Sequence, residues 1–263
     1  MTLTLGSAPL GTSGPPDVNY TVEGPRHRIL FANFPRRVRG TFNGETIFDT
    51  VDGRLLHESN ILPVLYVPEA DVRMDLLVPT DESTHCPFKG DANYWSIAVG
   101  DRTAESAVWG YAGTLEGAEW LAGYVAFYWD RLDAWFDEDE EVFGHLRDPF
   151  HRVDARLSSR HVVVRHGDDV LADTTRPVLV SETGLPNRFY LPAADVRTDL
   201  LTSSTTRTHC PYKGWTTYWS LRDGAASDVA WSYEDPMSDV AIAGGYLSFL
   251  ADDITTEVDG EII

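Results

Sequence analysis

Cys86-Pro87-Phe88-Lys89-Gly90 occurs a second time in the chain, as Cys210-Pro211-Tyr212-Lys213-Gly214. These two pentapeptides contain every cysteine and every lysine of the 263 residues, and all other cationic side chains are arginine or histidine. A compact ammonium can lose its proton when it is desolvated, which a guanidinium does not do. The motif therefore marks one candidate site in each half of the chain.

The repeat extends well beyond the motif. Residues 36–97 align without a gap onto residues 160–221 at an offset of 124, and about 24 of these 62 positions are identical. The offset then falls to 122, which places Trp109 on Trp231. This self-similarity indicates an internal duplication. We expect the two copies to pack against each other within the chain.

Each copy contains a series of short β-forming runs. Asn43-Gly44 and Gly167-Asp168 are turn signals between such runs, which is typical of tight hairpins. Pro68 and Pro192 each open a single helical turn, because proline suits the first position of a helix. The sequence therefore predicts a mainly β protein. It would have two duplicated, compact antiparallel β domains, sandwich-like or partly open and barrel-like, with few short helices.

The same patterns predict the domain boundaries. Residues 1–24 are rich in Gly, Ser, Pro and Thr and are expected to form a flexible N-terminal arm. The first β repeat is expected over 25–131 and the second over 160–255. Between them, 132–159 contains a run of acidic residues and is interpreted as a connector with some helical character. Residues 256–263 are interpreted as a tail.

Charge and composition narrow the class of partner. The formal net charge of −20 and the pI of about 4.6 argue against duplex nucleic acid and anionic lipid, which would repel the chain. No apolar run of about 18 residues and no signal-peptide pattern is present, so we expect no membrane span and a cytoplasmic location. Two cysteines are too few for a tetracysteine zinc site, and no cofactor is predicted.

The motif residues allow two interpretations in each copy. Lysine three residues after cysteine can lower the pKa of the thiol and make a nucleophile available, or the cysteine can be a small buried side chain. A glutamate at an aligned strand end can act as a general base or form an ion pair with the lysine. The candidate catalytic residues are Glu58, Cys86 and Lys89 in the first copy and Glu182, Cys210 and Lys213 in the second.

Other repeated side chains near the motif are candidates for ligand binding. An arginine in each copy either recognises an anion or belongs to a structural Arg–Asp network. The histidine before each motif cysteine is expected to line the pocket or to donate a hydrogen bond. The aromatic residues either pack in the core or form a wall for a planar ring or a cation. These candidates are Arg73, His85, Tyr94, Trp95 and Trp109, with Arg197, His209, Tyr218, Trp219 and Trp231 in the second copy.

Both copies resemble a known family. The residues that carry the resemblance in the first copy are Ala70-Asp71-Val72-Arg73-x-Asp75-Leu76-Leu77, Thr84-His85-Cys86-Pro87-Phe88-Lys89-Gly90, Tyr94-Trp95 and Val108-Trp109-x-Tyr111. Those in the second copy are Asp195-Val196-Arg197-x-Asp199-Leu200-Leu201, Thr208-His209-Cys210-Pro211-Tyr212-Lys213-Gly214, Tyr218-Trp219 and Ala230-Trp231-x-Tyr233. These patterns resemble the bacterial and fungal family catalogued as domain of unknown function 427, which is also labelled nucleotidyltransferase-like.

The resemblance implies a fold related to the β-tent group, whose better-known members hold a zinc ion with four cysteines. This chain has one cysteine per copy, so no metal site is predicted. The resemblance implies no mechanism, because the family has no established activity. No phosphate-binding Gly-x-x-x-x-Gly-Lys-Ser/Thr loop is present to support the nucleotidyltransferase label.

Three classes of function follow from these residues. The first is a module that binds a small planar or anionic ligand at the motif loop of each repeat. The second is an enzyme that uses the motif cysteine or lysine covalently, in the manner of a transferase. The third is an interaction scaffold in which the duplication only enlarges the β structure.

Overall fold

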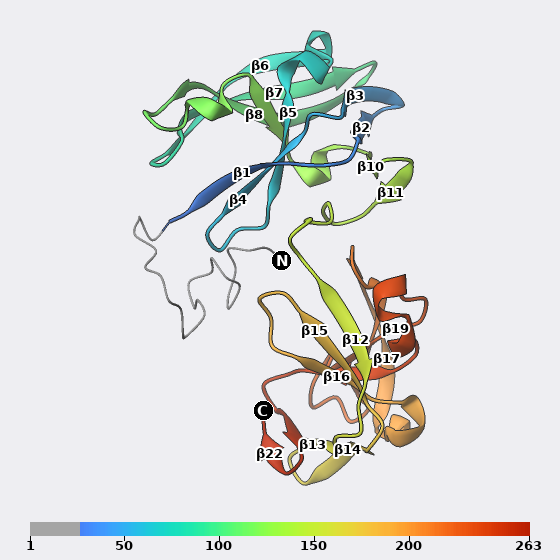
Figure 1. The fold of residues 1–263 in the computed structure, drawn as a ribbon. Coiled ribbons are helices and arrows are strands. Elements are labelled where there is room, and N and C mark those ends of the chain that lie inside the picture. Colours follow the sequence, from blue (N-terminus) through green and yellow to red (C-terminus); the bar gives the residue numbers. More distant parts are fainter. Residues whose placement is uncertain (1–26) are drawn as a thin grey trace, which may run out of the picture. The chain divides into compact units, whose positions relative to one another are not determined.

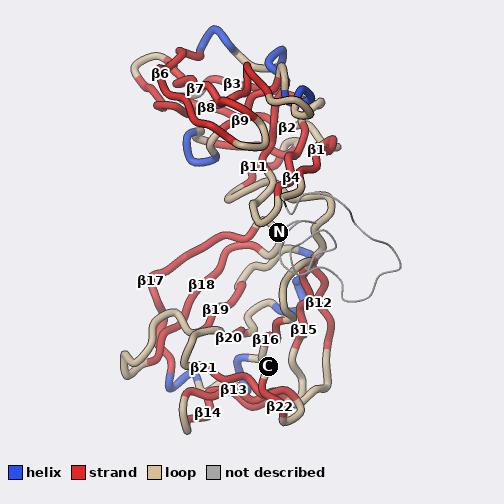
Figure 2. Tube along the Cα trace, turned by 90° about the vertical axis from the view of Figure 1, so that its left-hand side faces the viewer, coloured by secondary structure: helices blue, strands red, loops and turns tan. Residues whose placement is uncertain are grey.

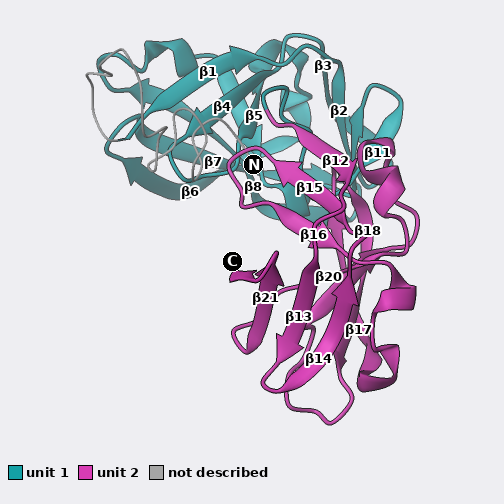
Figure 3. Cartoon of the chain, turned by 60° about the horizontal axis from the view of Figure 1, so that its bottom comes forward, with its two compact units in different colours: residues 1–150 teal, residues 151–263 magenta. Residues whose placement is uncertain are grey.

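The computed structural model describes residues 27–263, and the N-terminal arm expected over residues 1–24 lies outside them. The chain forms two compact units that divide between Phe150 and His151 (Figure 3). Each unit contains one copy of the repeat. The prediction of a duplicated, mainly β protein is confirmed.

The first unit is built from two antiparallel sheets (Figure 1). The larger sheet has seven strands in the order β1-β4-β5-β9-β8-β7-β6, and the smaller has four in the order β11-β10-β2-β3. The strands are β1 (Ile29–Asn33), β2 (Val38–Phe42), β3 (Glu45–Thr50), β4 (Arg54–Glu58), β5 (Val64–Pro68), β6 (Leu77–Cys86), β7 (Gly90–Val99), β8 (Arg102–Thr114), β9 (Tyr124–Phe127), β10 (Ala134–Asp137) and β11 (Glu140–Val142).

The second unit repeats these strands in the same chain order, with one difference. Strands β5 and β9 pair in the first unit, whereas their counterparts in the second unit are joined only by a bridge between Leu191 and Leu247. The large sheet is therefore divided into β12-β15-β16 and β17-β18-β19-β20, beside the sheet β14-β13-β21-β22. The strands are β12 (Val153–Leu157), β13 (Val162–His166), β14 (Asp169–Thr174), β15 (Val178–Glu182), β16 (Arg188–Tyr190), β17 (Leu201–Cys210), β18 (Gly214–Leu221), β19 (Ala230–Tyr233), β20 (Leu247–Phe249), β21 (Ile254–Val258) and β22 (Glu261–Ile262).

Helical structure in the described residues is limited to short 3₁₀ segments between strands (Figure 2). Pro68 and Pro192 precede two of these segments, as the sequence predicts, because their fixed φ of −55° suits the start of a helical turn. The segments are η1 (Glu69–Asp71), η2 (Met74–Leu76), η3 (Glu119–Leu121), η4 (Trp129–Arg131), η5 (Ala193–Asp195), η6 (Thr198–Leu200) and η7 (Ser238–Ala243).

The expected connector and the expected tail both contain strands that belong to the two repeats. Strand β10 pairs with β2, and β12 pairs with β15, so the segment interpreted as a connector with helical character supplies strands to both units. Strands β21 and β22 include most of the expected tail and form the counterpart of the β10–β11 hairpin. Glu138 and Asp259 occupy matching turn positions with φ of 55° and 53°. The acidic run is therefore a hairpin turn: Asp137 pairs with Arg36, and the four acidic residues that follow are exposed to solvent.

Alternation along the strands gives the large sheet of the first unit two different faces. Leu55, on β4, points to a core shared with the smaller sheet, and this core includes Phe48 and Trp135. Leu56, on the same strand, points to the opposite face, where it packs with Tyr66 in a second apolar cluster. The candidate site lies on this second face.

The motif closes the hairpin between β6 and β7. The Lys89 amide donates to the Cys86 carbonyl at 3.3 Å, and Cys86 pairs with Gly90 across the strands. Gly90 has a φ of +112°, and a Cβ atom at this position would lie 2.4 Å from the Gly113 carbonyl oxygen. Glycine is required here both by the dihedral angle and by the approach of β8.

Replacement of this glycine provides a test of the motif geometry. We expect Gly90→Ala to lower the free energy of unfolding by about 3 kcal/mol, because it combines a left-handed φ with a backbone clash. Gly44→Ala is the matched control, since Gly44 has a φ of +79° and an added Cβ there meets no atom within 4 Å. Urea denaturation measures both. Equal losses in the two variants would contradict the close approach.

Candidate functional site

In the first unit, His27, Glu58 and Lys89 form one hydrogen-bonded group. Lys89 Nζ donates to Glu58 Oε2, and His27 Nε2 lies 3.0 Å from Glu58 Oε1. Because a carboxylate only accepts hydrogen bonds, His27 Nε2 carries the hydrogen. Lys89 and Glu58 are both 7% exposed, so their charges are held largely away from water. Of the two interpretations for Glu58 and Lys89, the structure contains the ion pair.

The second unit contains the same group. Lys213 Nζ donates to Glu182 Oε2, and His151 Nε2 lies 3.1 Å from Glu182 Oε1. The side chain of His151 is fully buried. We call these two groups the His–Glu–Lys triads. Each triad joins three separate parts of its repeat: a residue two positions before the first strand, the end of the fourth strand and the motif loop.

The charges of the second triad stabilise one another. Burial alone would raise the pKa of Glu182, but the hydrogen bond from His151 and the charge and hydrogen bond of Lys213 lower it to about 2. Burial also disfavours the Lys213 ammonium, yet the neighbouring Cys210 and Glu182 raise its pKa above the ordinary 10.5. Lys213 is therefore a protonated ion-pair partner at neutral pH and is not available as an amine nucleophile.

An aromatic side chain of each motif covers the histidine of its triad. The Phe88 and His27 rings stack with centroids 4.1 Å apart, and the Tyr212 and His151 rings are 4.3 Å apart. The aromatic residue next to the motif lysine thus fixes the histidine from one side, while the glutamate fixes its Nε2 atom. The motif loop therefore contributes two contacts to the same triad.

Tyrosines and the motif cysteine surround the first triad. Lys89 Nζ lies 5.8 Å from the centroid of the Tyr111 ring, and Trp109 Nε1 donates to Tyr66 Oη at 3.3 Å. Burial raises the pKa of both tyrosines, so they remain protonated at neutral pH. Cys86 is a free thiol that packs against the same apolar cluster. The second unit repeats this arrangement with Tyr190, Tyr233, Trp231 and Cys210.

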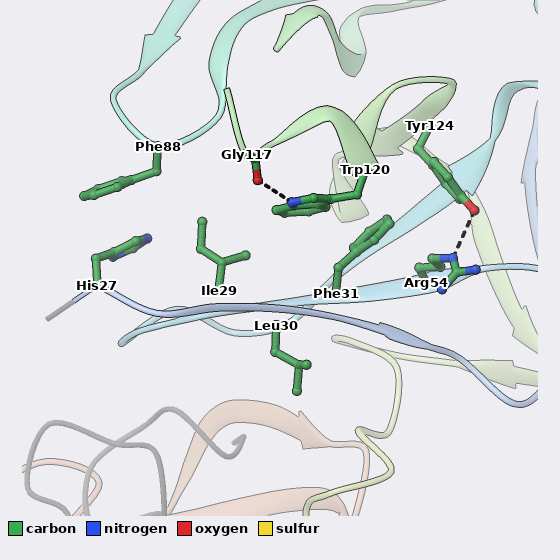
Figure 4. Close-up of a pocket in the computed structure, with 9 residues that line it drawn as sticks. All are labelled: His27, Ile29, Leu30, Phe31, Arg54, Phe88, Gly117, Trp120 and Tyr124. Carbon is green, nitrogen blue, oxygen red and sulfur yellow. Dashed lines mark hydrogen bonds between the residues drawn. The ribbon is translucent and has the colours of Figure 1, made fainter. Parts of the chain in front are cut away.

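A surface pocket of about 690 Å³ lies next to the first triad (Figure 4). Phe88 and His27 form one end of it, and Arg54 and Tyr124 form the other, with Trp120 and Phe31 between them (Figure 4). The alternation of β1 and β4 explains why these side chains meet, since Phe31 and Arg54 share the face of the sheet that also carries Glu58. The full lining is His27, Ile29, Leu30, Phe31, Arg54, Phe88, Gly117, Trp120 and Tyr124.

Several of the predicted ligand-binding residues of the first copy lie away from this pocket. Arg73 makes two hydrogen bonds to Asp75 at 2.8 and 2.7 Å and is exposed. His85 Nδ1 lies 2.6 Å from Asp91 on an exposed part of the β6–β7 hairpin. Trp95 packs against the core between the two sheets.

Two further predicted residues of the first copy pack in the cluster beneath the triad. Tyr94 is buried there and its hydroxyl lies 2.8 Å from Thr84 Oγ1. Trp109 is partly buried and donates to Tyr66. Neither residue lines the pocket. The side chains near the motif are thus divided between core packing and exposed ion pairs.

The second copy follows the same division. Arg197 makes two hydrogen bonds to Asp199, at 2.8 and 2.7 Å, and His209 packs against Trp215 with ring centroids 4.9 Å apart. Tyr218 contacts the Thr208 hydroxyl at 2.9 Å, and Trp219 packs against an apolar core. Trp231 donates to Tyr190 Oη at 3.0 Å.

The sequence interpretation missed both triad histidines and most of the pocket. His27-Arg28 and His151-Arg152 stand at the repeat offset of 124, but few other identities connect them to the aligned block that begins at residue 36. Phe31, Arg54 and Trp120 have no identical partner in the second repeat. The repeat therefore carries no signal for these three pocket residues.

The described residues offer no group of three or more His, Cys, Asp or Glu side chains that is arranged to hold a metal ion. In the same part of the chain, no helix has both the length and the apolar character required to cross a membrane.

The fold and the site define a class: a duplicated antiparallel β protein with one largely buried His–Glu–Lys triad per repeat. Comparison with family models identifies it further. The model described as domain of unknown function (DUF427) matches residues 31–138 and again residues 154–261, and the chain therefore belongs to this family as a tandem copy. No curated protein matches the chain.

Acid titration provides a test of the second triad. Because the pKa of Glu182 is lowered from 4.5 to about 2, this residue stabilises the fold above pH 4.5, and the contribution is lost as the pH falls toward 2. The contribution is on the order of 3 kcal/mol. We expect Glu182→Gln to lower the free energy of unfolding at pH 7 and to reduce its decline between pH 4.5 and 2, as measured by urea denaturation.

The exposed Glu261 is the control for this experiment. Glu261→Gln should leave both the stability and its pH dependence close to those of the wild type. If Glu182→Gln retained the full loss of stability between pH 4.5 and 2, the coupling of Glu182 to Lys213 and His151 would be wrong.

Proposed function

We propose that the first repeat binds a small planar ligand that carries an anionic group, in the pocket beside the motif loop. The observation that carries this proposal is the combination of one guanidinium and several aromatic side chains in a single opening on the face of the sheet that supports the triad. A volume of about 690 Å³ suits a small molecule.

Arg54 supplies the anion-binding group. Its Nε atom donates to Tyr124 Oη at 3.0 Å, and its Nη1 atom donates to Asn33 Oδ1. Both partners are uncharged groups, and within residues 27–263 Arg54 makes no ion pair. The guanidinium is therefore oriented by neutral hydrogen bonds and keeps its charge for a carboxylate or a phosphate.

The aromatic side chains supply the planar surface. Trp120 is held by a 2.7 Å hydrogen bond from its Nε1 atom to the Gly117 carbonyl, and it lies 5.0 Å from the Phe31 ring. Trp120 is 37% exposed and Phe88 is 47% exposed, so their ring surfaces are open to a ligand. A bound aromatic ring would gain both buried apolar area and ring contacts.

The motif lysine stabilises this site indirectly, without lining the pocket. Lys89 does not line the pocket, and its ammonium is paired with Glu58. Its role in the proposed function is to hold Glu58, which holds His27, while the adjacent Phe88 faces the opening. This arrangement favours binding over covalent chemistry by the lysine. A cytoplasmic location, with a small molecule as the partner, remains part of the proposal.

Isothermal titration calorimetry with a matched pair of probes tests the proposal. We expect 2-naphthoate to bind at least about tenfold more tightly than the neutral 2-naphthamide, because an arginine–carboxylate hydrogen bond contributes about 1.5 to 3 kcal/mol. Arg54→Gln should remove this preference and leave the weaker binding of the amide.

Arg207→Gln is the control, because Arg207 is an exposed arginine of the other unit whose guanidinium contacts only backbone carbonyls. It should leave both affinities unchanged. Equal affinities of the wild type for the two probes, or the absence of binding by either, would exclude the proposed ligand class.

A further inference from the structure

We infer that the two sites of this chain have diverged: the second repeat keeps the triad but has filled the pocket, so one chain binds one ligand. This inference rests on the proposed function. It also assigns Phe31, Arg54 and Trp120 as the residues that determine specificity, because they supply the guanidinium and two aromatic rings of the pocket, which the second repeat lacks at the aligned positions.

The side chains that hold the triad in place are equivalent in the two repeats. Histidine, glutamate and lysine form the triad in each, and an aromatic motif residue stacks on each histidine. The tryptophan-to-tyrosine hydrogen bond beneath the triad is also present twice. The duplication therefore preserved the buried polar group and its packing.

The pocket residues differ at aligned positions. The offset of 124 places Phe31 on Ala155 and Arg54 on Val178, and the offset of 122 places Trp120 on Ile242. The second repeat thus has no guanidinium at the anion-binding position and no aromatic ring at the two wall positions. A planar anion has neither of its two proposed contacts there.

In the second unit, packed side chains occupy the region that corresponds to the pocket of the first unit. In the first unit the pocket lies between β1, β4 and the segment that carries η3. In the second unit, η7 packs directly on β12 and β15, the counterparts of β1 and β4. Val240 and Ala243 of η7 are each 1% exposed and belong to one apolar cluster with Ala155 and Val178. The small side chains at 155 and 178 allow this close approach.

The stoichiometry of 2-naphthoate binding to the full chain tests the inference. We expect one equivalent per chain, and we expect Trp120→Ile, which installs the residue of the second repeat, to weaken that binding at least about tenfold. Ile242→Ala alters the matching exposed residue of the second unit and should change the affinity less than twofold. Two equivalents, or loss of binding in Ile242→Ala with retention in Trp120→Ile, would overturn the inference.

A second measurement tests the filled pocket without any ligand. Ala155→Phe forces a large ring into the packed cluster and should lower the Tm by about 4 °C or more. Ala225→Phe, the same exchange at an exposed alanine of this unit, should leave the Tm nearly unchanged. An unchanged Tm in Ala155→Phe would show that the second pocket is open and would overturn the inference. Failure of 2-naphthoate to bind the wild type, with the expected fall in Tm, would instead overturn the proposed function.

Discussion

The ion pair between the motif lysine and a strand-end glutamate, buried in the first unit and part-buried in the second, is the interaction on which both repeats depend. It connects the loop between two long strands to the end of β4 or β15, which are distant in sequence. Removal of one partner would leave a charge without compensation in a place that water hardly reaches, which costs about 3 to 5 kcal/mol. The histidine on the second carboxylate oxygen and the aromatic ring stacked on that histidine extend this interaction to the first strand of each repeat.

Successive side chains of a strand point to opposite faces of the sheet, and this alternation determines which residues surround the ion pair. Arg54, Leu56 and Glu58 share one face of β4, so the anion-binding group, the apolar support and the triad carboxylate are fixed by a single strand. Leu55, with the opposite orientation, belongs to the core between the two sheets. A shift of one residue in the register of β4 would remove all three from the site. The fold thus positions the site through pairing of the strands rather than through a flexible loop.

Local signals predicted much of the fold. Asn43 and Gly44 adopt φ of 49° and 79° in the β2–β3 hairpin, which is the geometry that an Asn-Gly turn favours. Charge patterning predicts a connector for the acidic run near Glu138, because it cannot distinguish a hairpin turn with exposed charges from a linker. Only the pairing of β10 with β2, which joins positions about a hundred residues apart, settles that assignment.

The site was predicted from side chains that the two repeats share, and residues present in one repeat only could not be found in this way. Side chains shared by the two repeats led to Glu58 and Lys89, which belong to the common support. His27 was missed because it lies in a divergent segment, and Arg54 and Trp120 were missed because they occur in one repeat only. Residues that distinguish duplicated copies leave no trace in a search for similarity, yet they are the ones that shape the pocket.

The central claim is that both motif lysines act as ion-pair partners of glutamate, and that Lys213 is protonated and not a reactive amine. Because Lys89 and Lys213 are the only lysines of the chain, nuclear magnetic resonance of protein labelled with ¹⁵N in the lysine side chains reports on both sites directly. The account predicts two slowly exchanging ammonium signals at neutral pH, with the Lys213 signal still present as the pH rises past 10.5. Absence of both signals, or conversion of Lys213 to the neutral amine near pH 7, would contradict it.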